Sequence, residues 1–244
     1  MENSRHSFCY DGTIEGLLCV YIRCIAMKIR PLSIKPDYML IGTPHEDSYI
    51  FVRSDVSRAD LLYKYIGERA SAEVQQMVSD CFLTSLPNKE LDLFDFVCSA
   101  IRYGARVAEE YEEPTIHRIQ MAIRDLYRES QLLVNDIKFC VESDVSIAEI
   151  NPRNCVLPLI KRRILSNPLY EDLLTYDRRH SLLLLRHGSE NEIIDIHKLS
   201  VPPVRGSKLL YETFWPYVLD GRSCSCNGLV KRKSDGLDVL WRIA

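Results

Sequence analysis

The chain has 244 residues, of which 46% are hydrophobic and 27% charged, and its formal net charge is −3 at pH 7. This length allows one large core or two small domains, and the composition is that of an ordinary globular protein. No apolar run reaches the roughly 18 residues that a membrane-spanning helix needs, so we expect no membrane partner.

The start of the chain and its cysteines indicate the compartment. Residues 1–7 lack the charged-then-apolar layout of a signal peptide. The nine cysteines are an odd number, so we expect a cytoplasmic protein with reduced thiols. Cys224 and Cys226 form the tightest pair, but a single C-x-C is a weak metal signal, and the histidines are scattered. We therefore expect neither a metal nor another cofactor.

The first half of the chain has mainly helical patterns. Residues 7–10 read as a short strand, and the apolar segment 13–28 predicts a buried helix. The segment 31–44 is rich in proline and glycine, which predicts an irregular loop. We expect a strand over 49–52, a helix from Ser54 or Asp55 to Glu68, and helices over 72–86, 89–111 and 114–134.

Beyond Asn135 the hydrophobic pattern changes to alternation. Strands are expected over 137–141, 145–150, 173–176, 181–187 and 192–197, and helices over 156–165 and 208–219. Helices followed by a meander of strands predict an α+β fold, in which a helical N-terminal region packs on a mainly antiparallel sheet with a C-terminal helix. No linker is evident, so we expect a single compact domain over residues 1–244, with an acidic helical region (residues 1–134) and a basic strand-rich region (residues 135–244).

Charge is distributed unevenly along the chain. Residues 1–150 hold 16 Lys and Arg against 24 Asp and Glu, a balance of −8, whereas residues 151–244 hold 15 against 10, a balance of +5. This asymmetry favours a face for a polyanion in the later residues, with solvated surface charge as the alternative. The basic residues expected to contact DNA are Arg178, Arg179, Lys231, Arg232 and Lys233.

The opening motif, residues 10–18 (Tyr-Asp-Gly-Thr-Ile-Glu-Gly-Leu-Leu), carries two acids in one corner. Asp11 ends the first strand and opens an apolar helix, where free backbone N–H groups and the positive end of the helix dipole gather. Glu15 lies four residues on. The alternative interpretation is an N-cap at Asp11 followed by an exposed first-turn glutamate.

This motif resembles the Tyr-Asp-Gly-Ser/Thr-x-Glu-Gly-x-Leu opening of a bacterial family of DNA-repair or DNA-metabolism proteins of unknown function. The resemblance runs nearly end to end, through Asp55, Glu129, 137–139, 156–159, 176–179, Tyr211, 214–217 and Asn227. Members of that family occur beside, or fused to, uracil-DNA-glycosylase-like domains, with a radical-SAM partner protein. The resemblance therefore implies action on double-stranded DNA.

The chain departs from the family at specific positions. Asn151 stands where the family has Glu, Asn154 where it has His, and Cys155 where it has Asn. Smaller or amide groups at these places would re-pattern a pocket, which favours an unusual base as substrate. A divergent relative of this kind is similar to proteins that defend bacteria by excising glucosylated hydroxymethylcytosine from phage DNA.

A base-excising enzyme needs carboxylates that orient water and stabilise an oxocarbenium-like sugar, and groups that stack on and read the extruded base. The candidate catalytic residues are Asp11, Glu15 and Asp177. The candidate substrate-binding residues are Tyr10, Asn151, Asn154, Tyr176, Trp215 and Asn227. The alternatives are core positions for the aromatic residues, a turn for Asp177, and helix caps for the two asparagines at 151 and 154.

We therefore expect a monofunctional, monomeric DNA glycosylase that removes a modified base. The sequence lacks a glycine-rich phosphate loop and a G-x-S-x-G elbow, and it also lacks the acidic-loop and histidine-loop motifs of ordinary uracil-DNA glycosylases. The first alternative is a non-catalytic DNA-binding or adaptor module for a glycosylase or a radical-SAM partner. The second is a small-molecule sequestering or regulatory protein.

Overall fold

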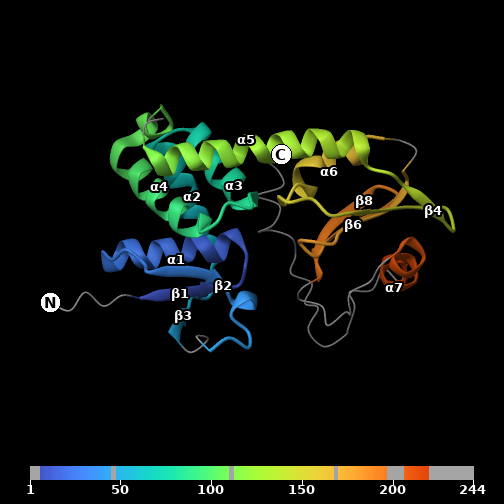
Figure 1. The fold of residues 1–244 in the computed structure, drawn as a ribbon, viewed down its shortest axis with the longest axis horizontal. Helices are drawn as coiled ribbons and strands as arrows, with labels where there is room; N and C mark the ends of the chain where they lie inside the picture. The colour runs from blue at the N-terminus through green and yellow to red at the C-terminus, as the bar shows by residue number, and fades with distance from the viewer. Residues whose placement is uncertain (1–5, 45–47, 110–112, 168–169, 197–205, 220–244) are drawn as a thin grey trace. The chain divides into compact units, whose positions relative to one another are not determined.

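The computed structural model describes residues 6–44, 48–109, 113–167, 170–196 and 206–219 (Figure 1). The chain forms two compact units, Met1–Asp125 and Leu126–Ala244, with the division inside one long helix. The expectation of a single domain stays a prediction. Several residues singled out in the sequence lie outside the described ranges: Cys224, Cys226, Asn227, Lys231, Arg232 and Lys233.

The first unit contains a small parallel sheet. Strand β1 (Ser7–Tyr10) lies in the middle, between β2 (Ser33–Pro36) and β3 (Tyr49–Phe51), and both neighbours run parallel to it. Helix α1 (Ile14–Met27) connects β1 to β2, since parallel strands need a crossover connection. In this arrangement Phe8 of β1 is fully buried.

The expectation of an irregular loop over 31–44 was wrong, because β2 and a short 3-10 helix, η1 (Asp37–Met39), lie within it. Pairing with β1 and burial of Ile34 stabilise the strand. Pro36 is its last residue, and β2 is an edge strand, where the missing N–H of proline is tolerated. The local proline signal was therefore overridden by tertiary pairing.

The remaining helices of this unit follow the predicted periodicity, but two of them end earlier than predicted. The predicted helix over 72–86 stops at Leu83 because Thr84 is extended and its hydroxyl donates to the Cys81 carbonyl at 2.7 Å. The predicted helix over 89–111 stops at Tyr103 because Gly104 has a φ of +72°. The elements are α2 (Val56–Arg69), α3 (Ala72–Leu83), α4 (Lys89–Tyr103), η3 (Gly104–Glu109) and α5 (Pro114–Asp136).

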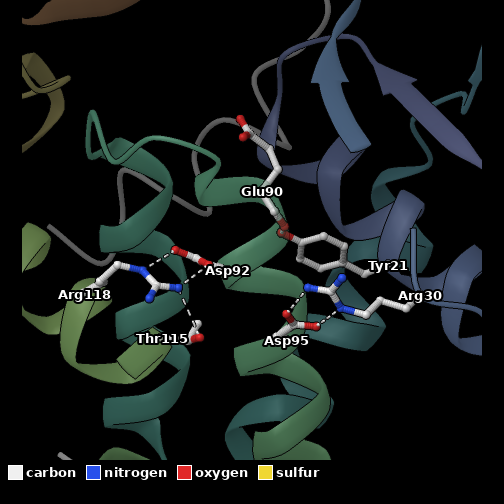
Figure 2. A network of polar contacts seen from close by, with 7 residues as sticks. All are labelled: Tyr21, Arg30, Glu90, Asp92, Asp95, Thr115 and Arg118. Carbon is white, nitrogen blue, oxygen red and sulfur yellow. Dashed lines mark hydrogen bonds and ion pairs between the residues drawn. The ribbon is translucent and has the colours of Figure 1, made fainter. Parts of the chain in front are cut away.

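Polar contacts fix α4 within the first unit (Figure 2). Arg30 donates twice to Asp95, at 3.0 and 2.7 Å, and Arg118 donates twice to Asp92, at 3.1 and 2.8 Å. The Tyr21 hydroxyl donates to the Glu90 carbonyl at 2.7 Å. Two-point guanidinium–carboxylate pairs fix direction as well as distance, so α4 is held to the end of α1 and to the start of α5.

The second unit contains a five-stranded sheet in the order β4-β5-β6-β7-β8. Strands β5 and β6 are parallel and the other neighbours are antiparallel, which confirms the predicted α+β class with a mainly antiparallel sheet and a C-terminal helix. The elements are β4 (Cys140–Glu142), β5 (Val145–Ile150), α6 (Leu157–Leu165), β6 (Asp172–Asp177), β7 (Leu182–His187), β8 (Glu190–Asp195) and α7 (Ser207–Leu219).

Helices cover both faces of this sheet. Phe214 and Trp215 of α7 pack on one face, against Leu174, Tyr176 and neighbouring apolar side chains. Arg186 points to the other face and donates to the Leu165 carbonyl at 2.8 Å, which places α6 there. No helix within the described ranges is long and apolar enough to cross a membrane.

We expect Thr175→Val to raise the free energy of unfolding by about 1 kcal/mol, because the substitution removes a buried, unpaired hydroxyl at nearly constant volume. Thr175 is 0% exposed on β6, and its Oγ1 has no hydrogen-bond partner. Thr84→Val is the matched control, since the Thr84 hydroxyl is also buried but bonded. It should lower the free energy by about the same amount. Denaturant unfolding of both variants tests the expectation, and equal losses would contradict it.

Candidate functional site

The carboxyl ends of β1, β2 and β3 lie at one edge of the parallel sheet of the first unit. In open sheets of parallel strands, ligands bind preferentially outside this edge, at the point where the strand order reverses. Here the chain runs from β1 through α1 to β2 on one side of β1, and then to β3 on the other side. We call the residues gathered at this edge, namely Asp11, Thr13, Glu15, Gly16 and Ser54, the carboxyl-edge site.

Asp11 holds the residue that caps α1. Its Oδ1 accepts hydrogen bonds from the backbone N–H of Thr13 at 3.1 Å and from the Thr13 hydroxyl at 2.5 Å. Thr13 is the N-cap itself, because its Oγ1 accepts from the Gly16 N–H at 3.0 Å. Asp11 therefore does not cap α1 itself but positions Thr13, the residue that does. Within the described residues, the Asp11 Oδ2 has no hydrogen-bond partner.

Gly16 allows side chains from two strand ends to approach the first turn of α1. A Cβ at this position would collide with the Asp11 carboxylate and lie 2.8 Å from Ser54 Oγ. The Ser54 Oγ is buried without a hydrogen-bond partner. Cys19 of α1 fixes the segment that carries Ser54. The Cys19 Sγ accepts from the Asp55 N–H at 3.3 Å and donates to the Asp55 carbonyl at 3.4 Å.

Glu15 and Asp11 occupy unlike environments. Glu15 is only 9% exposed, so the alternative of an exposed first-turn glutamate was wrong. Burial raises the pKa of Glu15, and the negative charges of Asp11 and Asp60 raise it further, against the lowering effect of its own N–H and the Thr13 hydroxyl. Two neighbouring carboxyl groups in unlike environments are suited to divide the roles of acid and base.

The candidate aromatic residues lie in the cores of their units. Tyr10 is 1% exposed, and its hydroxyl donates to Glu90 Oε1 at 3.4 Å. Tyr176 and Trp215 are 4% and 3% exposed and belong to the cluster under α7. Rings buried in this way present no face to a base, so the structure gives their predicted stacking role no support.

The candidate amides of the second unit differ in burial. Asn151 is exposed, whereas Asn154 is 2% exposed. The Asn154 N–H and its side-chain Nδ2 donate to Glu129 Oε2 at 2.8 and 2.7 Å, and the Arg153 N–H donates to Glu129 Oε1 at 2.6 Å. One carboxylate of α5 thus holds the turn that precedes α6, and Asn154 contributes a side chain to this clamp.

Asp177 is the last residue of β6, next to the turn that leads to β7, in the second unit. Its carboxylate is fully buried, and it accepts from the N–H groups of Arg179 and His180 at 3.1 and 3.2 Å. The exposed Arg178 pairs with Glu149 at 3.3 Å, and Arg179 is exposed. The structure therefore brings Asp177, Arg178 and Arg179 together, and separately gathers Asp11 and Glu15 in the first unit.

Three residues with notable geometry were not proposed as site residues from the sequence. In the sequence, Glu129 stands only among the residues that resemble the family, Ser54 only at the start of a predicted helix, and no pattern singles out His180. The sequence patterns around these three residues predict only local secondary structure. Their contacts could not be predicted from those patterns, because they form across the tertiary structure or within a turn. Among the described residues, no group of three His, Cys, Asp or Glu side chains is placed to hold a metal ion.

Comparison with known proteins gives no further guide to function, since no family model and no curated protein matches the chain. The resemblance of the opening motif to the DNA-repair family stays a prediction.

Proposed function

We propose that this protein is a monofunctional DNA glycosylase that hydrolyses an N-glycosidic bond at the carboxyl-edge site. The observation that supports this most is the meeting of two carboxyl groups of unlike environment, Asp11 and Glu15, at the carboxyl edge of a parallel sheet. Hydrolysis of glycosidic bonds passes through a positively charged, oxocarbenium-like sugar, and paired carboxyl groups serve it as acid, base and electrostatic stabiliser.

We infer the two roles from the environments of the carboxyl groups. Glu15, whose pKa is raised by burial, is the acid that protonates the departing base. Asp11, with its Oδ2 free of hydrogen bonds from described residues, orients the attacking water and accepts its proton. Water then adds to the anomeric carbon as the bond to the base breaks, which leaves an abasic site.

The proposed substrate is a modified base in double-stranded DNA, with glucosylated hydroxymethylcytosine as the first candidate from the family resemblance. Arg178 and Arg179 of the second unit would contact phosphates, because both are exposed on one turn. The protein would act as a cytoplasmic monomer. Recognition of the base by Asn154 has less support, since its amide is engaged by Glu129.

The decisive experiment incubates the purified full chain with plain, uracil-containing and hypermodified phage DNA. Alkali-labile abasic sites are then scored on each substrate. The proposal expects such sites on a modified DNA only, and their absence from all three substrates would contradict it.

The second candidate is a non-catalytic DNA-binding or adaptor module. It is favoured by the engagement of Asn154, Tyr176, Asp177 and Trp215 in the packing and turns of their own unit. It predicts duplex binding without release of any base, so the same incubations combined with a binding measurement separate it from the glycosylase.

A further inference from the structure

The turn between β6 and β7 contains a buried carboxylate paired with a histidine. Asp177 Oδ2 lies 2.8 Å from His180 Nδ1, and the Asp177 side chain is 0% exposed whereas that of His180 is 23% exposed. The Asp177 Oδ1 accepts the N–H groups of Arg179 and His180. Side chain and backbone of His180 are thus both fixed to the same carboxylate.

This pairing determines what His180 offers to a ligand. Because a carboxylate only accepts hydrogen bonds, the His180 Nδ1 carries the proton. The other ring nitrogen, Nε2, has no partner among the residues that the structure describes. A neutral His180 would therefore present a lone pair at Nε2, and only the protonated ring would present an N–H to an anion.

The charged groups near His180 are of both signs. Arg178 is paired with Glu149 of β5, but the exposed Arg179 guanidinium has no ion-pair partner in the described residues of the chain. On the other side, Asp195 of β8 stands opposite Leu182 in register, close to the turn. Arg179 and His180 are consecutive residues, and the backbone N–H groups of both are held by Asp177.

We propose that this turn binds a phosphate group of the DNA backbone through the Arg179 guanidinium and the Nε2 of His180, a contact that requires the protonated ring. The inference rests on DNA being the partner in the proposed function, and it adds a pH-dependent contact to it. In many hydrolases a carboxylate–histidine pair activates a serine or cysteine nucleophile that contacts the histidine. No described hydroxyl or thiol contacts His180 Nε2.

The test measures binding of an unmodified duplex by fluorescence anisotropy at pH 6 and pH 8. We expect wild type to bind more tightly at pH 6. His180→Gln should bind about tenfold more weakly than wild type at pH 6 and should lose the pH dependence. Arg179→Gln should lower the salt slope by about 0.9. This variant leaves the Asp177–His180 pair intact, so it tests the turn even if His180→Gln fails to fold.

Two control variants show whether the effect belongs to this turn. Arg162→Gln and Arg163→Gln each remove an exposed charge from α6. Both should retain the pH dependence of wild type. An equal pH dependence in wild type and folded His180→Gln would overturn the inference.

Two further readouts separate the possible outcomes. If inorganic phosphate shifts the NMR signals of His180 while no duplex binds, the ligand is a free phosphate and the assignment to DNA is wrong. Because plain duplex is the probe, binding that depends on His180 together with no base release would support this inference and contradict the glycosylase.

Discussion

Replacing Asp11 with asparagine is expected to reduce the rate of base release by at least ~100-fold, the scale of a lost charge that stabilises a transition state or accepts a proton. The fold should survive, because an asparagine Oδ1 can still accept from the N–H and hydroxyl of Thr13. Release of base from a modified substrate and thermal unfolding are measured together. Unfolding of the variant, or unchanged turnover, would leave Asp11 with a structural role only.

Asp37→Asn is the matched control for this substitution. Asp37 follows the neighbouring strand β2, and its Oδ1 accepts from a local N–H, that of Tyr38, at 2.7 Å. This bond also survives the change to asparagine. Turnover of Asp37→Asn should stay near that of wild type, so a similar loss in both variants would show a general effect of removing charge from this sheet edge.

The pH profile gives a second readout for Asp11. Burial is the largest cause of the raised pKa of Glu15, and the charge of Asp11 adds to it. An acid loses activity as pH rises through its pKa. In Asp11→Asn the residual activity should therefore fall at a lower pH than in wild type. A profile that does not move would remove Glu15 from the role of acid.

Most elements of the fold could be predicted from the sequence because their hydrophobic periods are local. The predicted helix over 114–134 has nearly the same bounds as α5, and the predicted strands over 145–150 and 181–187 have nearly the same bounds as β5 and β7. Strand β2 could not be predicted from the sequence, because its stability comes from pairing with β1 and its composition is that of a loop. The parallel pairing of β5 with β6 was also missed, although the predicted strand–helix–strand order over 145–176 is that of a crossover connection.

The candidate site was only partly predictable, for a related reason. Asp11 and Glu15 are four residues apart at a strand–helix junction, and the sequence alone places them in one corner. Ser54 joins them through tertiary approach, which Gly16 permits. The amide of Asn154 could not be distinguished from a base-reading group, because its partner, Glu129, lies 25 residues earlier on another element.

Removing the Glu129 carboxylate is expected to lower the stability more than any other substitution described above. Glu129→Ala should lower the free energy of unfolding by about 3 kcal/mol, because one carboxylate accepts three hydrogen bonds and buried donors left unpaired are costly. Asn154→Ala removes one of the three bonds and should cost about 1 kcal/mol. Gln131→Ala, at an exposed position of the same helix, should change the free energy by less than about 0.5 kcal/mol.

Denaturant unfolding of the three variants, combined with the base-release assay, separates the two roles of Asn154. If Asn154 serves only the clamp, its loss of activity should follow its loss of stability, and Glu129→Ala should lose more of both. A loss of activity on the modified base in Asn154→Ala, with stability close to that of wild type, would contradict the clamp interpretation. The amide would then read the substrate, and the hydrogen bond to Glu129 would position it for that purpose.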